Sequence, residues 1–348
     1  MRQRHFASDN AAGVHPAVWE ALRAADTGHA LAYGYDDWTL RLNEVLSAHL
    51  GECLAFPVFN GTGANTLALK TLCKPWESVI CTDVAHLYAD ECGAPEQIAG
   101  VKLVPVPTTD GRLTPAQIEP LLQGTGQEHQ VQPRLLSITN STEYGTVYRP
   151  ETIRLLADMV HQKGCLLHLD GARLYNAAAS LGVSLKELTS DCGVDILSLG
   201  GTKNGLLMGE VLVFFHPEQG MDFRFIRKQN LQLMSKMRYL SAQMLALFKD
   251  NLWFELAAHA NERARQLADG VREIPGIEIT QPVEANGVFA TLHPAIAREV
   301  RSEFLFYDWD SQHNEVRWMC SWDTTKEDVQ DFITTLRNAS ERHFVSQL

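Results

Sequence analysis

Residues 165–173, Cys-Leu-Leu-His-Leu-Asp-Gly-Ala-Arg, and residues 195–203, Asp-Ile-Leu-Ser-Leu-Gly-Gly-Thr-Lys, carry the strongest signal of the fold class. Each stretch is a short apolar run followed by a polar turn that contains glycine, which is typical of a buried strand at the point where the chain leaves a sheet. Similar runs precede them and alternate with segments of helical periodicity. Short apolar strands separated by helices predict βαβ units and a mostly parallel sheet, which is the α/β class.

Outward from these runs, the sequence predicts two domains. Strands are predicted at 54–59, 78–81, 101–106, 134–139, 165–170, 195–199 and 210–215, with helices after Gly61, from Thr114-Pro115 and over 151–162. Pro57 places the first strand at a sheet edge, because proline cannot donate a ladder hydrogen bond. Long helices are predicted over 221–268, followed by strands at 277–279, 288–292 and 315–319 and helices at 294–303 and from Lys326. We therefore predict a large α/β domain over residues 1–250, N-terminal segment included, and a small C-terminal α+β domain over 251–348.

Composition excludes several classes of protein. The 348 residues are 45% hydrophobic and carry a net charge of −12, which disfavours nucleic-acid binding because an acidic chain repels phosphates. The seven cysteines are scattered and form no C-x-x-C pair, so neither a disulfide scaffold nor a zinc ribbon is expected, and a cytoplasmic location is predicted. No H-E-x-x-H motif, targeting segment or membrane segment is present, so we expect no metal site and no membrane partner.

Polar residues follow several predicted strands, where ligands of such sheets bind. Gly61-Thr62-Gly63 is a glycine-rich loop before a helix and is a candidate anion site. Asp83 lies twenty residues after Gly63, so a nicotinamide dinucleotide site stays open as an alternative. Asn60 and Asn65 are expected to satisfy local turn and cap hydrogen bonds.

Asp170 and Lys203 each lie just past an apolar strand, at the same edge of the sheet. Burying an ammonium group is costly, so a lysine there is best explained as an amine nucleophile whose pKa is lowered. Asp170 could pair with Lys203 or with a cofactor ring nitrogen, and a purely structural ion pair is the alternative. His86 could stack on an aromatic cofactor, and Arg173 and Arg317 could bind a carboxylate through two parallel hydrogen bonds.

Seven motifs in order resemble one family, and the resemblance covers most of the chain. They are Ser8-Asp9-Asn10, Tyr33-Gly34-Tyr35-Asp36, Gly61-Thr62-Gly63-Ala64-Asn65, Ala85-His86, Leu169-Asp170-Gly171-Ala172-Arg173, Thr202-Lys203-Asn204-Gly205 and Val316-Arg317 before Trp322-Asp323. As a set they resemble the pyridoxal-phosphate-dependent threonine aldolases of the β-eliminating lyase group, with the aspartate-aminotransferase-like fold (fold type I). The segment 140–148, with Thr-Lys-Asn-Gly, is most similar to the phenylserine-aldolase-like branch.

The resemblance implies a set of site residues. Lys203 would hold pyridoxal 5′-phosphate as a Schiff base, Asp170 would pair with the pyridine nitrogen, and His86 would stack on the ring; these three are the catalytic candidates. The other implied cofactor-binding residues are Gly61, Thr62, Gly63, Arg173 and Thr202. The implied substrate-binding residues are Ser8, Tyr33, Thr142, Arg173 and Arg317. The resemblance also implies a homo-oligomer, dimer or tetramer, with the active site between subunits, where Tyr33 and basic residues within 227–228 or 236–238 could reach a neighbouring site.

The activity implied is retro-aldol cleavage of a β-hydroxy-α-amino acid, of the threonine, allo-threonine or phenylserine type, to glycine and an aldehyde. One departure from the family affects this expectation: Thr142 stands where many threonine aldolases have a histidine that handles the β-hydroxyl group. That proton would then go to His86, Glu143 or water. The alternatives are β-elimination or amino transfer with the same cofactor, a nicotinamide-dependent oxidoreductase, and a partner-binding protein with a degenerate site.

Overall fold

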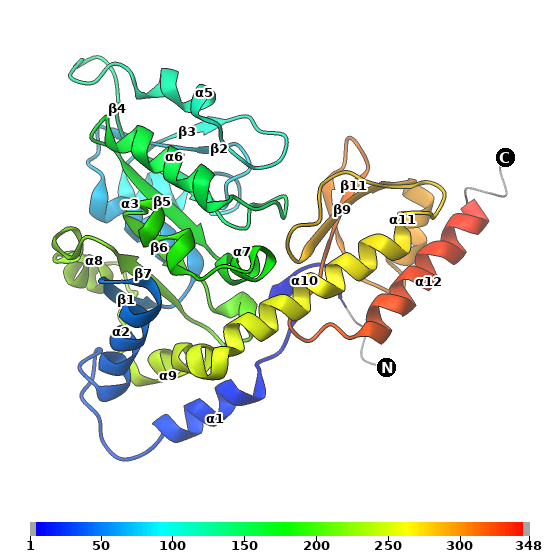
Figure 1. Cartoon of the computed structure of the whole chain (residues 1–348), viewed down its shortest axis with the longest axis horizontal. Coiled ribbons are helices and arrows are strands. Elements are labelled where there is room, and N and C mark those ends of the chain that lie inside the picture. Colours follow the sequence, from blue (N-terminus) through cyan, green and yellow to red (C-terminus); the bar gives the residue numbers. More distant parts are fainter. Residues whose placement is uncertain (1–4, 344–348) are drawn as a thin grey trace.

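A seven-stranded sheet in the order β1-β7-β6-β5-β4-β2-β3 forms the centre of the large lobe (Figure 1). The structure is a computed structural model and describes residues 5–343. The strands are β1 (Leu54–Val58), β2 (Glu77–Thr82), β3 (Lys102–Val106), β4 (Gln132–Thr139), β5 (Leu166–Gly171), β6 (Ile196–Leu199) and β7 (Glu210–Phe214). Only β7 runs against its neighbours within this sheet, so the predicted mostly parallel sheet is confirmed. Strand β1 is an edge strand, as Pro57 predicts.

Helices cover both faces of this sheet. They are α1 (Pro16–Ala25), α2 (Asp37–Leu50), α3 (Gly61–Leu72), α4 (His86–Ala89), α5 (Pro115–Ile118), α6 (Pro150–His161), α7 (Leu174–Leu181), α8 (Phe223–Gln229) and α9 (Arg238–Phe248). Helix α3 packs on one face with Phe223 of α8, and α6 and α7 pack on the other. The central strands are therefore buried on both sides, which explains why they read as continuous apolar runs.

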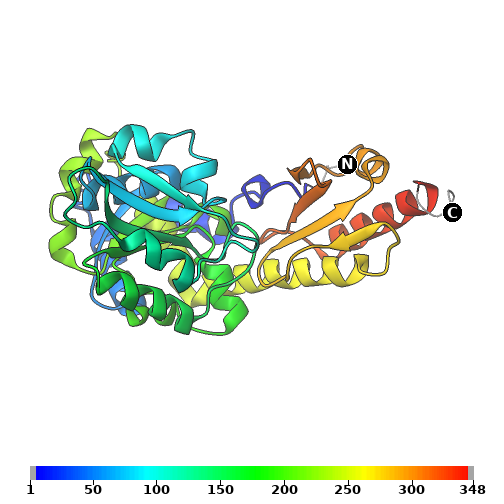
Figure 2. The same cartoon turned by 90° about the horizontal axis from the view of Figure 1, so that it is seen from above.

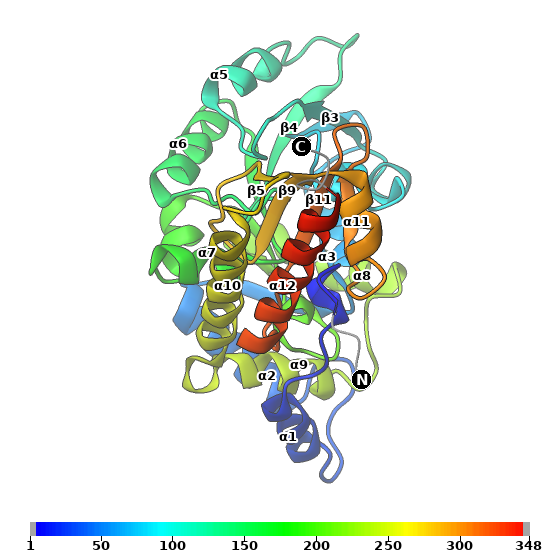
Figure 3. The ribbon, with the colours of Figure 1, turned by 90° about the vertical axis from the view of Figure 1, so that its right-hand side faces the viewer.

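The small lobe contains a second, antiparallel sheet in the order β10-β11-β9-β8. Its elements are α10 (Leu252–Val271), β8 (Ile277–Ile279), β9 (Gly287–Leu292), α11 (Pro294–Val300), β10 (Tyr307–Asp310), β11 (Glu315–Met319) and α12 (Lys326–His343). Figure 3 shows α10 and α12 side by side in front of β9 and β11. Strand β10 was not predicted, because its sequence Tyr-Asp-Trp-Asp is largely polar and exposed and lacks an apolar face.

Two segments connect the lobes. Helix α10 runs from one lobe into the other (Figure 2): Trp253 and Leu256 lie in the core of the large lobe, and Leu267 lies in that of the small lobe. At the N-terminus, Phe6 stacks on Phe332 of α12 with ring centroids 4.4 Å apart, and Met319 donates a backbone hydrogen bond to Phe6. The predicted division between residues 250 and 251 stays a prediction, and both of these segments contribute to more than one lobe.

Among the described residues, no helix has the combination of length and apolar character that crossing a membrane requires.

Candidate active site

Asp170, at the carboxyl end of β5, is almost fully buried and accepts one hydrogen bond at each carboxylate oxygen. Its Oδ2 accepts a 2.7 Å hydrogen bond from Nδ2 of Asn65, and its Oδ1 accepts one of 2.9 Å from the N–H of Ala172. The prediction that Asn65 serves only its own helix is wrong, because this side chain reaches across to another strand. A carboxylate oxygen can accept more than one hydrogen bond, so the oxygens of Asp170 retain capacity for a further N–H donor.

Lys203 lies in the turn that follows β6, next to the Asp170 turn. A Cβ atom on Gly200 would lie 2.6 Å from the carbonyl oxygen of Ala172, so the two turns pack backbone against backbone and require glycine here. Burial lowers the pKa of Lys203, and the charge of Arg173 lowers it further, against the opposing pull of nearby carboxylates. A lowered pKa favours the neutral amine, which is the form that attacks a carbonyl group.

Glu210, the first residue of β7, accepts a hydrogen bond from the turn that contains Lys203. Its Oε2 accepts a 2.8 Å hydrogen bond from the N–H of Gly201, and burial raises its pKa to about 7. Sequence reasoning missed this residue, because the run 210–215 was interpreted only as a core strand. The signal was present: an acidic residue opening an otherwise apolar strand needs a buried partner.

Arg173 makes a two-pronged ion pair with Asp9 of the N-terminal segment. Its Nε and Nη2 donate to the two Asp9 oxygens over 2.6 and 3.0 Å, and Asn286 donates to Asp9 over 3.1 Å. Sequence analysis named Ser8 and Arg173 but missed Asp9. The Ser8 hydroxyl accepts a hydrogen bond from the N–H of Asn10 and so caps the turn that carries Asp9. Substrate contacts of Ser8 and Arg173 stay predictions.

The Asp9 ion pair predicts a loss of stability in acid. Burial by itself would raise the pKa of Asp9, but the charges of Arg173 and Lys203 and the hydrogen bonds outweigh it and lower the pKa from 3.8 to about 2. The folded carboxyl therefore releases its proton at a lower pH than the unfolded one. Its stabilising contribution is complete above pH 4 and is lost as the pH falls towards 2.

We expect Asp9→Asn to lower the free energy of unfolding by about 2 kcal/mol at pH 7 and by much less near pH 2.5. Urea unfolding of the cofactor-free protein at both pH values measures the difference. Asp331→Asn, on the exposed side of α12, is the control and should change little at either pH. An Asp9 variant that lost equal stability at both pH values would contradict the assignment.

His86 begins α4 and is held by two carboxylates. The backbone N–H of His86 donates to Oε1 of Glu143 over 3.0 Å, and its ring Nδ1 lies 2.9 Å from Oε1 of Glu91. Glu143 also accepts a 2.7 Å hydrogen bond from the Thr139 hydroxyl, and burial raises its pKa to about 7. A raised pKa favours the protonated form of Glu143 more than in a solvated glutamate, so this side chain is a candidate for proton exchange.

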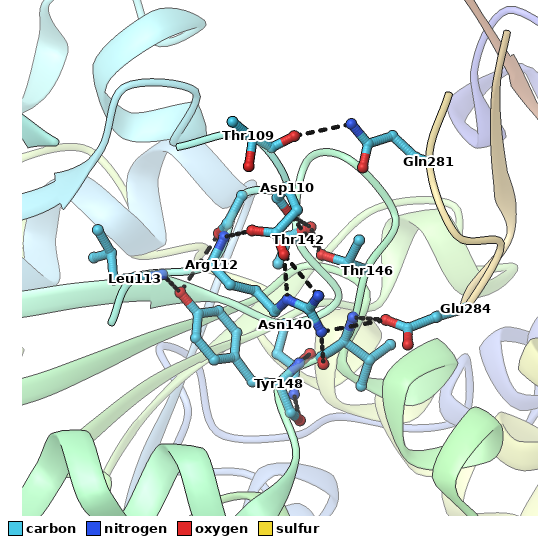
Figure 4. Close-up of polar contacts among 12 residues, drawn as sticks. Thr109, Asp110, Arg112, Leu113, Asn140, Thr142, Thr146, Tyr148, Gln281 and Glu284 are labelled. Atoms are coloured by element: carbon cyan, nitrogen blue, oxygen red, sulfur yellow. Dashed lines mark hydrogen bonds and ion pairs between the residues drawn. The ribbon is translucent and has the colours of Figure 1, made fainter. Parts of the chain in front are cut away.

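Thr142 lies in a hydrogen-bonded loop between the lobes (Figure 4). Its hydroxyl is 2.7 Å from that of Thr146 and 3.4 Å from the Asp110 carbonyl oxygen. Glu284 of the small lobe accepts a 2.7 Å hydrogen bond from the N–H of Val147, which ties the loop to that lobe. The predicted contact of Thr142 with substrate stays a prediction.

Of the two other predicted substrate-binding residues, Arg317 lies near the Ser8–Asp9 segment and Tyr33 lies on the surface. Arg317 projects from β11, donates to the Ala7 carbonyl over 3.4 Å and stacks on Trp309, so it lies beside the Ser8–Asp9 segment. Burial lowers its pKa, and the charge of Arg173 adds to this. Tyr33 lies on the exposed connection between α1 and α2, under the ammonium group of Lys228 at 5.0 Å. The structure thus groups Arg317 with Arg173 and leaves Tyr33 on the surface.

The predicted glycine-rich loop is instead the first turn of α3. Asn60 caps this helix by accepting a 2.7 Å hydrogen bond from the N–H of Gly63, as predicted for Asn60. The N–H groups of Gly61 and Thr62 have no acceptor within the helix, which suits an anion at this end. A Cβ on Gly63 would collide with the Gln232 side chain at 2.6 Å. Thr202, the other predicted phosphate contact, precedes Lys203 in the turn after β6.

Asp83, the acid on which the nicotinamide alternative depends, has a structural partner. Its Oδ1 accepts hydrogen bonds from the N–H and the hydroxyl of Thr108 over 3.1 and 3.3 Å, which joins the ends of β2 and β3. Over residues 5–343, no group of three or more His, Cys, Asp and Glu side chains is arranged to hold a metal ion.

Comparisons with known proteins agree with this geometry. Residues 5–295 match the family model described as beta-eliminating lyase. The low specificity L-threonine aldolase of Pseudomonas aeruginosa is 43% identical over 337 residues, covering 96% of this chain and 97% of that protein. The same-named protein of a Pseudomonas species is 42% identical and spans 97% of this chain and 98% of its own.

A solved structure of threonine aldolase from Leishmania major superposes with a TM-score of 0.91 at 30% identity, covering 97% of this chain and 99% of that one. Together with the sheet order and the strand-end lysine and aspartate, these matches place the protein. The chain belongs to the beta-eliminating lyase family, in its threonine aldolase group, and so to the pyridoxal-phosphate-dependent enzymes of fold type I.

Proposed function

We propose that this protein is a carbon–carbon lyase that cleaves β-hydroxy-α-amino acids of the L-threonine, L-allo-threonine or phenylserine type to glycine and an aldehyde. The observation that carries the proposal is the close packing of the Lys203 turn on the Asp170 turn, with the Asp9–Arg173 pair beside them. The two relatives that match almost the whole chain are both named low specificity L-threonine aldolase, which supports this substrate class.

The residues present fit pyridoxal 5′-phosphate. Lys203 offers a buried amine of lowered pKa, Asp170 a buried carboxyl acceptor for a ring N–H, and the α3 N-terminus a set of free N–H groups for a phosphate. When bound, this cofactor supplies an aldehyde that captures an amine covalently and a ring that withdraws electrons from the bonds at the α-carbon of an amino acid. We assign Lys203 to the aldehyde group of the cofactor, Asp170 to its ring nitrogen and Thr62 to its phosphate.

The remaining steps belong to the side chains of this protein. Asp170 would hold a proton at the ring nitrogen of the bound cofactor by its charge. Arg317, whose pKa is lowered by burial and by the charge of Arg173, would orient the substrate carboxylate, and this positioning would set which bond at the α-carbon breaks. A proton must leave the β-hydroxyl group as the aldehyde forms, and we assign it to His86 or Glu143, two groups on which the charge of Asp170 acts.

A substrate panel tests the proposal. Threonine, allo-threonine and phenylserine isomers should each yield glycine and the matching aldehyde in equal amounts, with L isomers preferred. Release of pyruvate from serine would indicate β-elimination, and amino transfer to a keto acid would indicate an aminotransferase. If no isomer yielded both products in the purified, cofactor-loaded protein, the aldolase proposal would fail.

We also propose that the enzyme is a homo-oligomer with its active sites between subunits. Large apolar side chains are exposed on two segments that hydrogen-bond to each other between Tyr33 and Ser235. The exposed residues are Leu31, Tyr33, Tyr35, Phe225 and Leu231. Gln232, next to Leu231, contacts Gly63 at the proposed phosphate end, so a subunit covering this surface would reach the site. Sedimentation should give a mass of two or four chains; a monomer at active concentrations would exclude it.

We place the enzyme in the cytoplasm. All seven cysteines are free thiols, and five of them are buried, as is usual in a reducing compartment.

A further inference from the structure

A continuous chain of hydrogen bonds links Asp170 to His86 through two buried residues for which no role has been assigned. Nδ2 of Asn65 donates to Oδ2 of Asp170 over 2.7 Å and to Oε1 of Glu91 over 3.0 Å. The same Glu91 oxygen lies 2.9 Å from Nδ1 of His86. Asn65 and Glu91 are 2% and 4% exposed, so the two bonds that Asn65 donates are shielded from water, whereas the His86 side chain is 40% exposed.

The chemistry of the partners determines the orientation of each group in this chain. Asp170 and an ionised Glu91 are acceptors only, so the amide that joins them must present its nitrogen, with one hydrogen to each carboxylate. By the same reasoning, Nδ1 of His86 must carry a hydrogen where it meets Glu91. A neutral His86 then has its lone pair at Nε2.

We propose that Glu91 is a positioning residue that holds His86 in the Nδ1-protonated form, so that Nε2 is the atom that accepts a proton during the reaction. This inference rests on the proposed function and deepens it, because it assigns the proton that leaves the β-hydroxyl group to a defined nitrogen. Asn65 completes the arrangement: it donates to both carboxylates and so links the imidazole, through Glu91, to Asp170, the residue assigned to the ring nitrogen.

The charges around His86 agree with this assignment. The hydrogen bond to Glu91 raises the pKa of His86, and burial lowers it. The charge of Asp170 also raises this pKa, and the charge of Lys203 lowers it. Glu143, in the loop that follows β4, accepts a hydrogen bond from the backbone N–H of His86. Burial raises the pKa of Glu91 itself, and the hydrogen bonds from His86 and Asn65 counteract this. Glu91 is thus the only one of these charges that touches the imidazole in the described chain.

Two variants separate charge from hydrogen bonding. Glu91→Gln has the same shape and can still accept through its amide oxygen, so it removes only the charge. Glu91→Leu removes the acceptor as well. Glu299→Gln is the matched control, because Oε2 of Glu299 lies 2.6 Å from Nε2 of His343 at the far end of the small lobe.

The first readout is ¹⁵N NMR of histidine-labelled, cofactor-free protein, with the His86 signals assigned through His86→Asn. We expect wild-type His86 to be protonated at Nδ1 when neutral. Its pKa should fall by about one unit in Glu91→Gln, and both neutral forms should appear in Glu91→Leu. Glu299→Gln should leave the His86 signals unchanged.

The second readout is the pH profile of kcat in the loaded enzyme. A proton acceptor must be unprotonated to act, so kcat falls at low pH where His86 is protonated. This acid limb of the profile should move to lower pH by about one unit in Glu91→Gln. Glu91→Leu should lose roughly 10²-fold in kcat with little change in KM. An unchanged His86 pKa in Glu91→Gln, or an unchanged proton position in Glu91→Leu, overturns the inference. These NMR results decide it even if the substrate panel rejects the aldolase activity.

Discussion

Lys203→Ala should lower turnover by roughly 10⁴-fold or more and should remove the visible absorbance that the bound cofactor gives the protein. The physical reason is the position of the amine. Lys203 is buried in a turn that packs on the Asp170 turn, and burial lowers its pKa, so it is the side chain available there as a neutral nucleophile. Glycine release from threonine and the absorbance spectrum of the purified variant are the two measurements.

A matched control separates the loss of this amine from the loss of any lysine. Lys163→Ala, in the exposed turn that follows α6, removes a solvated ammonium group and should keep both turnover and colour. Adding a small primary amine to Lys203→Ala should restore part of the turnover, since the missing chemistry is that of an amine. Normal turnover in Lys203→Ala would remove this lysine from the mechanism.

Asp170→Asn should lower kcat by about 10²- to 10⁴-fold while the protein still folds and still takes up the cofactor. An asparagine has the same shape, and its amide oxygen can still accept one of the hydrogen bonds that Asn65 and Ala172 donate. What it lacks is the negative charge that, in the role proposed for Asp170, would hold a proton on the ring nitrogen of the bound cofactor. The loss should therefore fall on kcat, with a smaller change in KM, because the charge matters most as electrons move towards the ring.

The comparison variant is Asp158→Asn on the exposed face of α6, where a carboxylate faces solvent. It should be indistinguishable from the wild-type enzyme in kcat and in stability. Full activity of Asp170→Asn would mean that the ring nitrogen needs no buried charge in this protein, and the electron-withdrawing role of Asp170 would be abandoned.

Period and length of the apolar runs predict much of this fold. The strands around β5 and β6 are continuous apolar segments because helices cover both faces of the sheet, and such segments are recognisable one at a time. The residues that end them, Asp170 and Lys203, are polar at a place where polarity has a cost. That local contradiction between residue and environment is why both could be identified before any contact was known.

The partners of those residues could not be identified in the same way. Asn65 looks like an ordinary helix residue, yet it bonds to Asp170, which is 105 positions away, and Asp9 pairs with Arg173 across 164 positions. Nothing in the residues next to them signals these pairings. Glu91 and Glu210 were missed for the same reason, since an isolated acidic residue in a sequence is most often a solvated one.

Local chemistry therefore settled the class of sheet, the strand-end lysine and aspartate, and the helix cap at Asn60, because periodicity, burial cost and capping act between residues close together along the chain. The folded chain alone decided which carboxylate meets Arg173, which acid touches His86 and how the Thr142 loop is tied to Glu284. Those choices depend on where the sheet and the two lobes bring distant segments together, and a hydrogen bond between distant residues forms only once the intervening chain has packed.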